Sequence, residues 1–168
     1  HQNSFWFAQG LIVKGWAMAH MGQPAQGLQL LLQGFSIIRG TGSAFVLCSS
    51  AAWLGEVCGM AGKIEEGLSM LEDSISQSNS AGNLHMMSAN YICHGELSLQ
   101  LNKPEQTEAD FEKAIEIAPY FAIAHNNLAV AYLKKGELKK AIHHCDKAVE
   151  YGYEVHPGFL EELKAFRK

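Results

Sequence analysis

Apolar residues along this chain recur every three or four positions, the spacing that places them on one face of an α-helix. The pattern is clearest in residues 122–153, where two amphipathic helices are predicted on either side of a turn at Lys135-Gly136-Glu137. Small residues are expected where the two helices approach closely, and larger ones between them: Leu128, Ala129, Tyr132, Gly136, Ala141, Cys145 and Ala148. One such hairpin cannot bury its apolar face alone, so the pattern predicts neighbouring hairpins.

Three further turns match the one at Gly136. They are centred on Gly22, Gly62 and Asn102, so successive turns are 40, 40 and 34 residues apart. Gly or Asn after an apolar helix end is the expected left-handed cap, and Pro two residues later can open the next helix. The sequence therefore predicts a single domain of four hairpins and a capping helix: residues 4–42, 43–82, 83–119 and 120–153, with the cap over 157–167.

Glycines occupy repeated positions inside the predicted helices. Gly15, Gly55 and Gly95 recur in the first helices of three hairpins, while Gly27 and Gly34 lie in the second helix of the first hairpin. Because Gly inside a helix costs roughly 1 kcal/mol relative to Ala, these positions predict close packing between helices. The helices that the periodicity delimits are 25–38, 44–60, 64–78, 84–101 and 105–117, with residues 78–83 predicted to be a turn.

Composition is that of a folded protein, with 48% hydrophobic and 18% charged residues. The net charge of −4 argues against a nucleic-acid surface, which would carry a basic stripe. Residues 1–100 contain only nine of the charged residues, against twenty-one in residues 101–168. The N-terminal part is therefore expected to be covered by something else. The start at His1, without an initiator methionine, suggests a piece cut from a longer protein.

The four cysteines form no C-x-x-C pair and fall inside predicted helices. Buried, reduced thiols are expected, which favours a cytoplasmic setting. Residues 5–21 form the most apolar window, but Gln9, Lys14 and His20 interrupt it, and it is short for a membrane span. No interaction with a membrane is therefore predicted.

The repeat pattern resembles tetratricopeptide repeat proteins over almost the whole chain, and residues 121–153 match the generic repeat closely. Residues 4–101 resemble a narrower group, the helical repeats of large bacterial multidomain regulators that carry cyclase-like or transcription-regulator-like heads and ATPase modules. The stretches that carry this resemblance are FWFAQGLIVKGWAMAHMGQPAQGLQLL, AAWLGEVCGMAGKIEEGLSML and ANYICHGELSLQLN. The resemblance implies a right-handed superhelical solenoid that serves as a regulatory or partner-binding appendage, without an active site.

In such a solenoid the first helix of each hairpin lines a concave surface suited to peptides. The repeat register places the following candidate partner-binding residues there: Gln9, Ile12, Trp16, His20, Trp53, Glu56, Met60, Ile92, Glu96, Gln100, Asn126, Val130 and Lys134. Trp is a favoured anchor at interfaces, although Trp16 and Trp53 would also suit the space between hairpins. Glu56 and Glu96 occupy positions that Lys and Asn would hold in a carboxylate clamp, so a basic or neutral partner segment is predicted instead.

Two other functions are consistent with the sequence. The apolar first helix, with Phe5, Trp6, Phe7, Leu11 and Ile12, would allow association with another copy of the chain. A groove between Trp16 and Trp53 would allow binding of a small molecule.

The chain contains eight histidines, but they predict neither a metal site nor a catalytic one. Adjacent helical residues point about 100° apart, so His143, His144 and Cys145 cannot all bind one ion. Cys93 and His94 likewise leave the helix in different directions and form no nucleophile–base pair. His94 and His125 are predicted to be structural histidines of the core. The prediction is a non-enzymatic protein with no cofactor.

Overall fold

A computed structural model describes residues 2–41, 44–81 and 84–167, and within these ranges all regular structure is α-helical. The helices are α1 Gln2–His20, α2 Pro24–Thr41, α3 Ala44–Met60, α4 Ile64–Ala81, α5 Leu84–Gln100, α6 Pro104–Ile117, α7 Ala122–Lys135, α8 Leu138–Glu150 and α9 Pro157–Lys164. They pair as four hairpins followed by a single C-terminal helix. The predicted all-α repeat fold is therefore confirmed.

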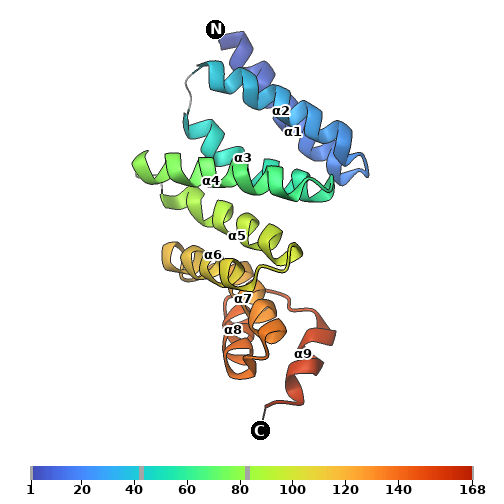
Figure 1. The fold of residues 1–168 in the computed structure, drawn as a ribbon, viewed down its shortest axis with the longest axis vertical. Helices are drawn as coiled ribbons and strands as arrows, with labels where there is room; N and C mark the ends of the chain where they lie inside the picture. Colours follow the sequence, from blue (N-terminus) through green and yellow to red (C-terminus); the bar gives the residue numbers. More distant parts are fainter. Residues whose placement is uncertain (1, 42–43, 82–83, 168) are drawn as a thin grey trace.

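The hairpins stack in chain order, so that the two termini lie at opposite ends of an elongated molecule (Figure 1). The first helices form a continuous layer, because α1 contacts α3, α3 contacts α5 and α5 contacts α7. Among the described residues, by contrast, no contact joins α2 to α4 or α4 to α6. The second helices of neighbouring hairpins are thus further apart than the first helices. The first helices therefore form the inner layer of the solenoid.

The four predicted turns adopt left-handed backbone conformations. The φ angles are 86° at Gly22, 72° at Gly62, 54° at Asn102 and 78° at Gly136. At each turn the amide of the following residue donates to a carbonyl in the last turn of the preceding helix, as in Glu137 N to Tyr132 O at 2.9 Å. This is the hydrogen-bond pattern of a Schellman motif, which satisfies the exposed helix end.

Glycines bring the two helices of a hairpin close together, with direct backbone contact in the first hairpin. A Cβ added at Gly15 would lie 2.5 Å from the carbonyl oxygen of Gly27, and one added at Gly27 would lie 2.4 Å from that of Gly15. A Cβ at Gly55 would similarly lie 2.6 Å from Leu71, and one at Gly95 would lie 2.6 Å from the ring of Phe111. The predicted role of these glycines is confirmed, and their contacts recur every 40 residues.

Some helix boundaries differ from those predicted. Helix α2 continues to Thr41 and α4 to Ala81, so residues 78–81 are helical rather than part of a turn. Ser and Asn reduce helix propensity by only a fraction of the cost of Gly or Pro, which is too little to end a helix on their own. The remainder of the predicted turn, residues 82 and 83, lies outside the described residues.

The last hairpin is covered by α9 as expected. Leu163 is fully buried, and Phe159 and Leu160 pack against the same apolar cluster. The helix ends at Lys164, however, short of the predicted end at residue 167, and Phe166 lies beyond it with 47% of its surface exposed. In the described part of the chain, no helix has the length and apolarity needed to cross a membrane.

Candidate partner-binding face

Trp16, His20, Trp53 and Glu56 form a polar–aromatic cluster between the first two hairpins, which we call the Trp16–Glu56 cluster. The indole N–H of Trp16 donates to Glu56 Oε2 at 2.8 Å, and His20 Nε2 lies 3.3 Å from Glu56 Oε1. The rings of Trp16 and His20 are 4.1 Å apart, one helical turn from each other on α1. Helices α1 and α3 thus meet at the Glu56 carboxylate, which accepts a hydrogen bond from the Trp16 indole and lies beside the His20 ring.

The two tryptophans of this cluster have different roles. Their ring centroids are 5.7 Å apart, so the rings are in contact and leave no groove between them for a ligand. The location that the sequence suggested for a small-molecule site is therefore wrong. Trp16 is partly buried and packs against the core of the first hairpin, whereas Trp53 keeps 40% of its surface exposed. Trp53 is the one that remains accessible to a partner.

Glu96 on α5 occupies the position of Glu56 one repeat later. It accepts a hydrogen bond from Asn127 Nδ2 at 2.7 Å, and Asn126 in turn donates to Asn127 Oδ1 at 3.3 Å. Burial raises the pKa of Glu96, the bond from Asn127 opposes this shift, and the charge of Glu56 adds to it. The two carboxylates therefore share one electrostatic environment along the inner layer.

Asn127 was not among the residues predicted from the sequence. Its neighbour Asn126 was chosen because its helical offset points to the concave side. The residue that holds Glu96, however, lies one position further, on the side of α7 that faces the preceding hairpin. The equivalent position one repeat earlier is Cys93, whose Sγ lies 3.4 Å from the carbonyl oxygen of Ala52 in the preceding hairpin. Both positions thus face the preceding hairpin, a relation that appears in the sequence only as their 34-residue offset.

The other candidate residues divide into exposed and buried groups. Met60 is 43% exposed, Gln100 and Lys134 are exposed, and Gln9 and Val130 are partly buried. Ile12 and Ile92 are 0% and 6% exposed, so their placement on the partner-binding surface was wrong. Ile12 lies against Gly34 of α2, and Ile92 packs into the core of the C-terminal hairpins. Both residues therefore lie in the core beneath the inner layer.

His94 and Cys93 point to different partners, as the helical geometry requires. His94 Nδ1 donates to Asp110 Oδ2 at 2.7 Å, while its Nε2 lies 3.5 Å from Glu72 Oε1 without forming a hydrogen bond. Burial alone would lower the pKa of His94, but the hydrogen bond and charge of Asp110, helped by Glu72, raise it overall. Burial raises the pKa of the Cys93 thiol far above its usual range. This arrangement stabilises the packing of α5 on α6, and it contains no activated nucleophile.

All four cysteines are buried and free, as predicted. Desolvation also raises the pKa of Cys58, to about 11, so this thiol is as unreactive as that of Cys93.

The remaining histidine pair is structural. His125 Nε2 donates to the carbonyl oxygen of Pro119 at 3.0 Å, so its Nδ1 accepts from His144 Nδ1, also at 3.0 Å. His143, the exposed neighbour, presents its ring edge-on to that of His144. Within the described ranges no group of His, Cys, Asp and Glu side chains has the arrangement of a metal site.

We expect His144 to make the stability of the fourth hairpin depend on pH. Burial, with the neighbouring His125, His143 and Lys140, lowers the pKa of His144 from 6.5 to about 4. The unfolded chain therefore binds the proton more readily, and this contribution to stability is lost as the pH falls from about 6.5 through 4. His144→Gln should lose less unfolding free energy between pH 7 and pH 5 than the wild type, measured by urea denaturation. His143→Gln is the matched control, and an equal loss in all three proteins would contradict the assignment.

Comparison with known proteins agrees with the repeat architecture. Residues 91–121 and 122–151 each match the tetratricopeptide repeat family. An uncharacterized protein of Rhizobium meliloti (strain 1021), R02095, is 29% identical over 115 residues, which is 66% of this chain and 11% of that protein. The chain thus matches only about a tenth of the length of this relative.

Solved structures of MamA have the same fold. One crystal structure covers 95% of this chain and 81% of its own, with a TM-score of 0.67 and 21% sequence identity. The structure of the MamA RS-1 ArsTM double mutant covers 93% and 80%, with a TM-score of 0.69 and 16% identity. At these identities the likeness establishes the fold, a solenoid of tetratricopeptide-like repeats.

Proposed function

We propose that the chain is a non-enzymatic scaffold whose inner layer binds a protein segment that carries lysine or arginine. The observation that carries this proposal is that two glutamates, Glu56 and Glu96, lie 40 residues apart at the same position of adjacent hairpins. Trp53 lies one helical turn from Glu56 and is partly exposed. A guanidinium or ammonium group of the partner would pair with a glutamate and rest on the Trp53 ring.

Selection from a random peptide display library tests this proposal, because the library offers the chain peptides of every charge. The wild-type chain should enrich peptides rich in Lys and Arg, because the face presents two carboxylates and an aromatic ring. Trp53→Ala should weaken binding of the enriched peptides about tenfold, a typical loss for an aromatic interface anchor. Glu56→Lys with Glu96→Lys should reverse the charge preference.

Glu162→Lys supplies the control for charge reversal, because Glu162 is exposed on α9 at the far end of the solenoid. This variant should enrich the same peptides as the wild type. Enrichment of acidic peptides by the wild type, or unchanged affinity in Trp53→Ala and in the Glu56→Lys, Glu96→Lys double variant, would refute the proposal.

A second candidate function, self-association through α1, rests on a separate observation. Trp6, Phe7 and Val13 are 71%, 58% and 52% exposed, on a helix with little charge. One repeat later, at the position of Trp6, Val46 is only 7% exposed because the preceding hairpin covers it. A second copy of the chain would cover α1 in the same way. Sedimentation velocity should then detect dimers that Trp6→Glu abolishes, and a monomer at high concentration would rule this function out.

The setting of the chain is also a proposal. Four buried thiols with no disulfide among them are consistent with a reducing, cytoplasmic environment. The resemblance of residues 4–101 to the repeats of bacterial multidomain regulators, and a relative about nine times longer than the matched segment, support a role as the partner-binding part of a larger regulator.

A further inference from the structure

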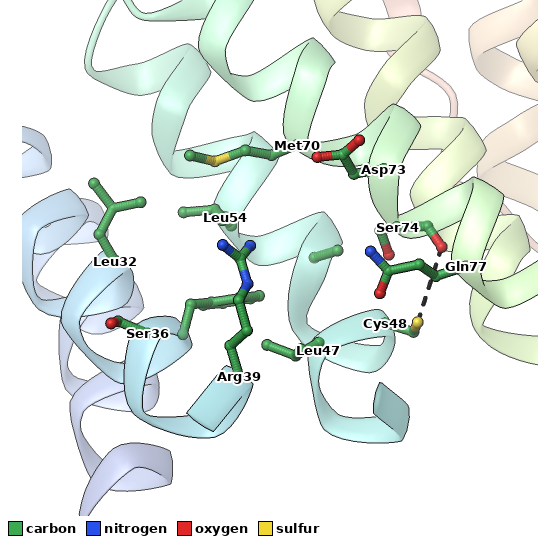
Figure 2. A pocket seen from close by; sticks show the side chains of 12 residues that line it. Leu32, Ser36, Arg39, Leu47, Cys48, Leu54, Met70, Asp73, Ser74 and Gln77 are labelled. Carbon is green, nitrogen blue, oxygen red and sulfur yellow. Dashed lines mark hydrogen bonds between the residues drawn. The ribbon is translucent and has the colours of Figure 1, made fainter. Parts of the chain in front are cut away.

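A cavity of about 140 Å³ lies between α2, α3 and α4, at the junction of the first two hairpins. Its walls are mainly apolar, formed by Leu32, Phe35, Leu47, Ala51, Leu54 and Met70. Arg39 extends over it from the last turn of α2, and Asp73 and Ser74 lie on the side of α4 (Figure 2). The cavity is separate from the Trp16–Glu56 cluster, since none of the four residues of that cluster lines it.

The same junction one repeat later carries different side chains. The residues 40 positions after Leu32, Leu54 and Met70 are Glu72, His94 and Asp110, which form the ion-paired group described above. The residue 40 positions after Ala51 is Tyr91, which packs against the core. At the first junction, therefore, three apolar side chains stand in place of the ion-paired group, and the methyl group of Ala51 stands in place of a tyrosine ring. Of these differences, Ala51 in place of a tyrosine is the one that removes volume, and the three apolar side chains make the space apolar, so the cavity does not follow from the repeat fold itself.

Size and charge indicate what the cavity would hold. A cavity of about 150 Å³ accommodates one benzene ring, so a single ring or a branched aliphatic group is the largest apolar body that fits. Among the described residues no carboxylate lies within ion-pair distance of Arg39, although Asp73 lines the same cavity. The exposed guanidinium of Arg39, which has no ion-pair partner among the described residues, is suited to bidentate binding of a carboxylate at the rim of this apolar cavity.

We propose that this cavity binds a small carboxylic acid with one aromatic ring or a branched aliphatic group. The apolar group would enter between Leu54 and Met70, and the carboxylate would accept hydrogen bonds from Arg39. Because α2, α3 and α4 all contribute walls, the ligand would fix the angle between the first two hairpins. It would thereby change the spacing of the inner layer without occupying it.

Titration followed by NMR of the methyl groups tests the proposal, with 3-phenylpropionate as the probe. The Met70 and Leu54 methyl resonances should shift saturably, with a dissociation constant of about a millimolar, given the ordinary affinity per atom of small ligands. Toluene, which lacks the carboxylate, and phenethylamine, which carries the opposite charge, should bind more weakly. Tighter binding of phenethylamine would assign recognition to Asp73 and overturn the proposal.

Two variants test the contribution of the cavity and that of the Arg39 charge separately. Ala51→Tyr installs the residue that the next repeat carries at this position and should abolish the shifts while the helical circular dichroism stays unchanged. Arg39→Gln should raise the dissociation constant for 3-phenylpropionate about fivefold, the range expected for an exposed ion pair. Lys14→Gln, which removes a distant cation on α1, is the control. Saturable binding that persists in Ala51→Tyr, equal effects of Arg39→Gln and Lys14→Gln, or no shift up to the solubility limit would each refute the site.

Discussion

Gly27→Ala is expected to destabilise the first hairpin by about 3 kcal/mol, the upper part of the range for an overpacked core. The new methyl group would lie 2.4 Å from the carbonyl oxygen of Gly15 and 2.9 Å from the amide nitrogen of Ala19. Both are backbone atoms, which no change of rotamer can move aside. Helices α1 and α2 would have to separate, and the contacts of Leu31 and Ile12 along the same seam would be lost in part.

Urea denaturation followed by tryptophan fluorescence measures this loss. Because each hairpin of a solenoid contributes its own stability, the first hairpin should unfold at lower urea than the rest, and Trp16 reports on it. Gly10→Ala is the matched control, since Gly10 is an exposed glycine of α1, the other helix of the same hairpin, with no atom within 4 Å of an added Cβ. The control should gain up to about 1 kcal/mol from helix propensity. A Gly27→Ala protein as stable as the wild type would contradict the close approach of the two helices.

Phe111→Ala is expected to cost about 4 kcal/mol, since removing a buried aromatic ring costs between about 3 and 5 kcal/mol. Phe111 is fully buried, and its ring fills the space left by the missing side chain of Gly95. Phe166→Ala, at a residue that is 47% exposed, should change stability by less than about 1 kcal/mol. Equal losses in the two variants would show that Phe111 is not a core residue.

A double-mutant cycle tests the contact between Gly95 and Phe111 directly. Gly95→Ala places a methyl group 2.6 Å from Phe111 Cε1 and should destabilise the protein. In a Phe111→Leu background the smaller side chain makes room, so the same substitution should cost at least about 1 kcal/mol less. Additive losses would mean that the ring moves aside freely.

The sequence predicts the parts of this fold that depend on residues with few alternatives. A left-handed turn needs Gly or Asn, so Gly22, Gly62, Asn102 and Gly136 located the four hairpins. A backbone contact between helices needs Gly, so Gly15 and its equivalents fixed the repeat register. Helix ends at residues 38–41 and 78–81 were less predictable, because Gly40 and Thr41 in the first case, and Ser and Asn in the second, are tolerated in a last helical turn.

Sequence reasoning was less successful for the binding face. Ile12 and Ile92 were placed on the surface because helical offsets give directions only to within the 100° between neighbouring residues. Which of two adjacent positions is covered depends on how far successive hairpins are rotated, and a single hairpin does not determine that rotation. Asn126 and Asn127 illustrate the same uncertainty, since the structure pairs Glu96 with the second of the two.

The cavity was missed because it depends on one small side chain, that of Ala51. Sequence patterns identify sites by the functional groups of their residues. Ala51 has no such group, and alanine is common in any helix. Only the comparison of Ala51 with Tyr91, 40 residues later, shows that a large group is missing from the first junction.

Both ends of the solenoid have apolar cores, but the C-terminal end also has an ion-paired corner. At the N-terminal end, α1 and α2 meet through glycine backbone contacts and apolar side chains, whereas Lys135 and Lys140 join Glu108 and Glu137 in an ion-paired corner between α6, α7 and α8. Apolar association weakens on cooling, and exposed ion pairs are screened by salt. Cooling should therefore weaken the cores at both ends, while added salt should act mainly on the last hairpin. The salt concentration should therefore change which end of the solenoid unfolds first.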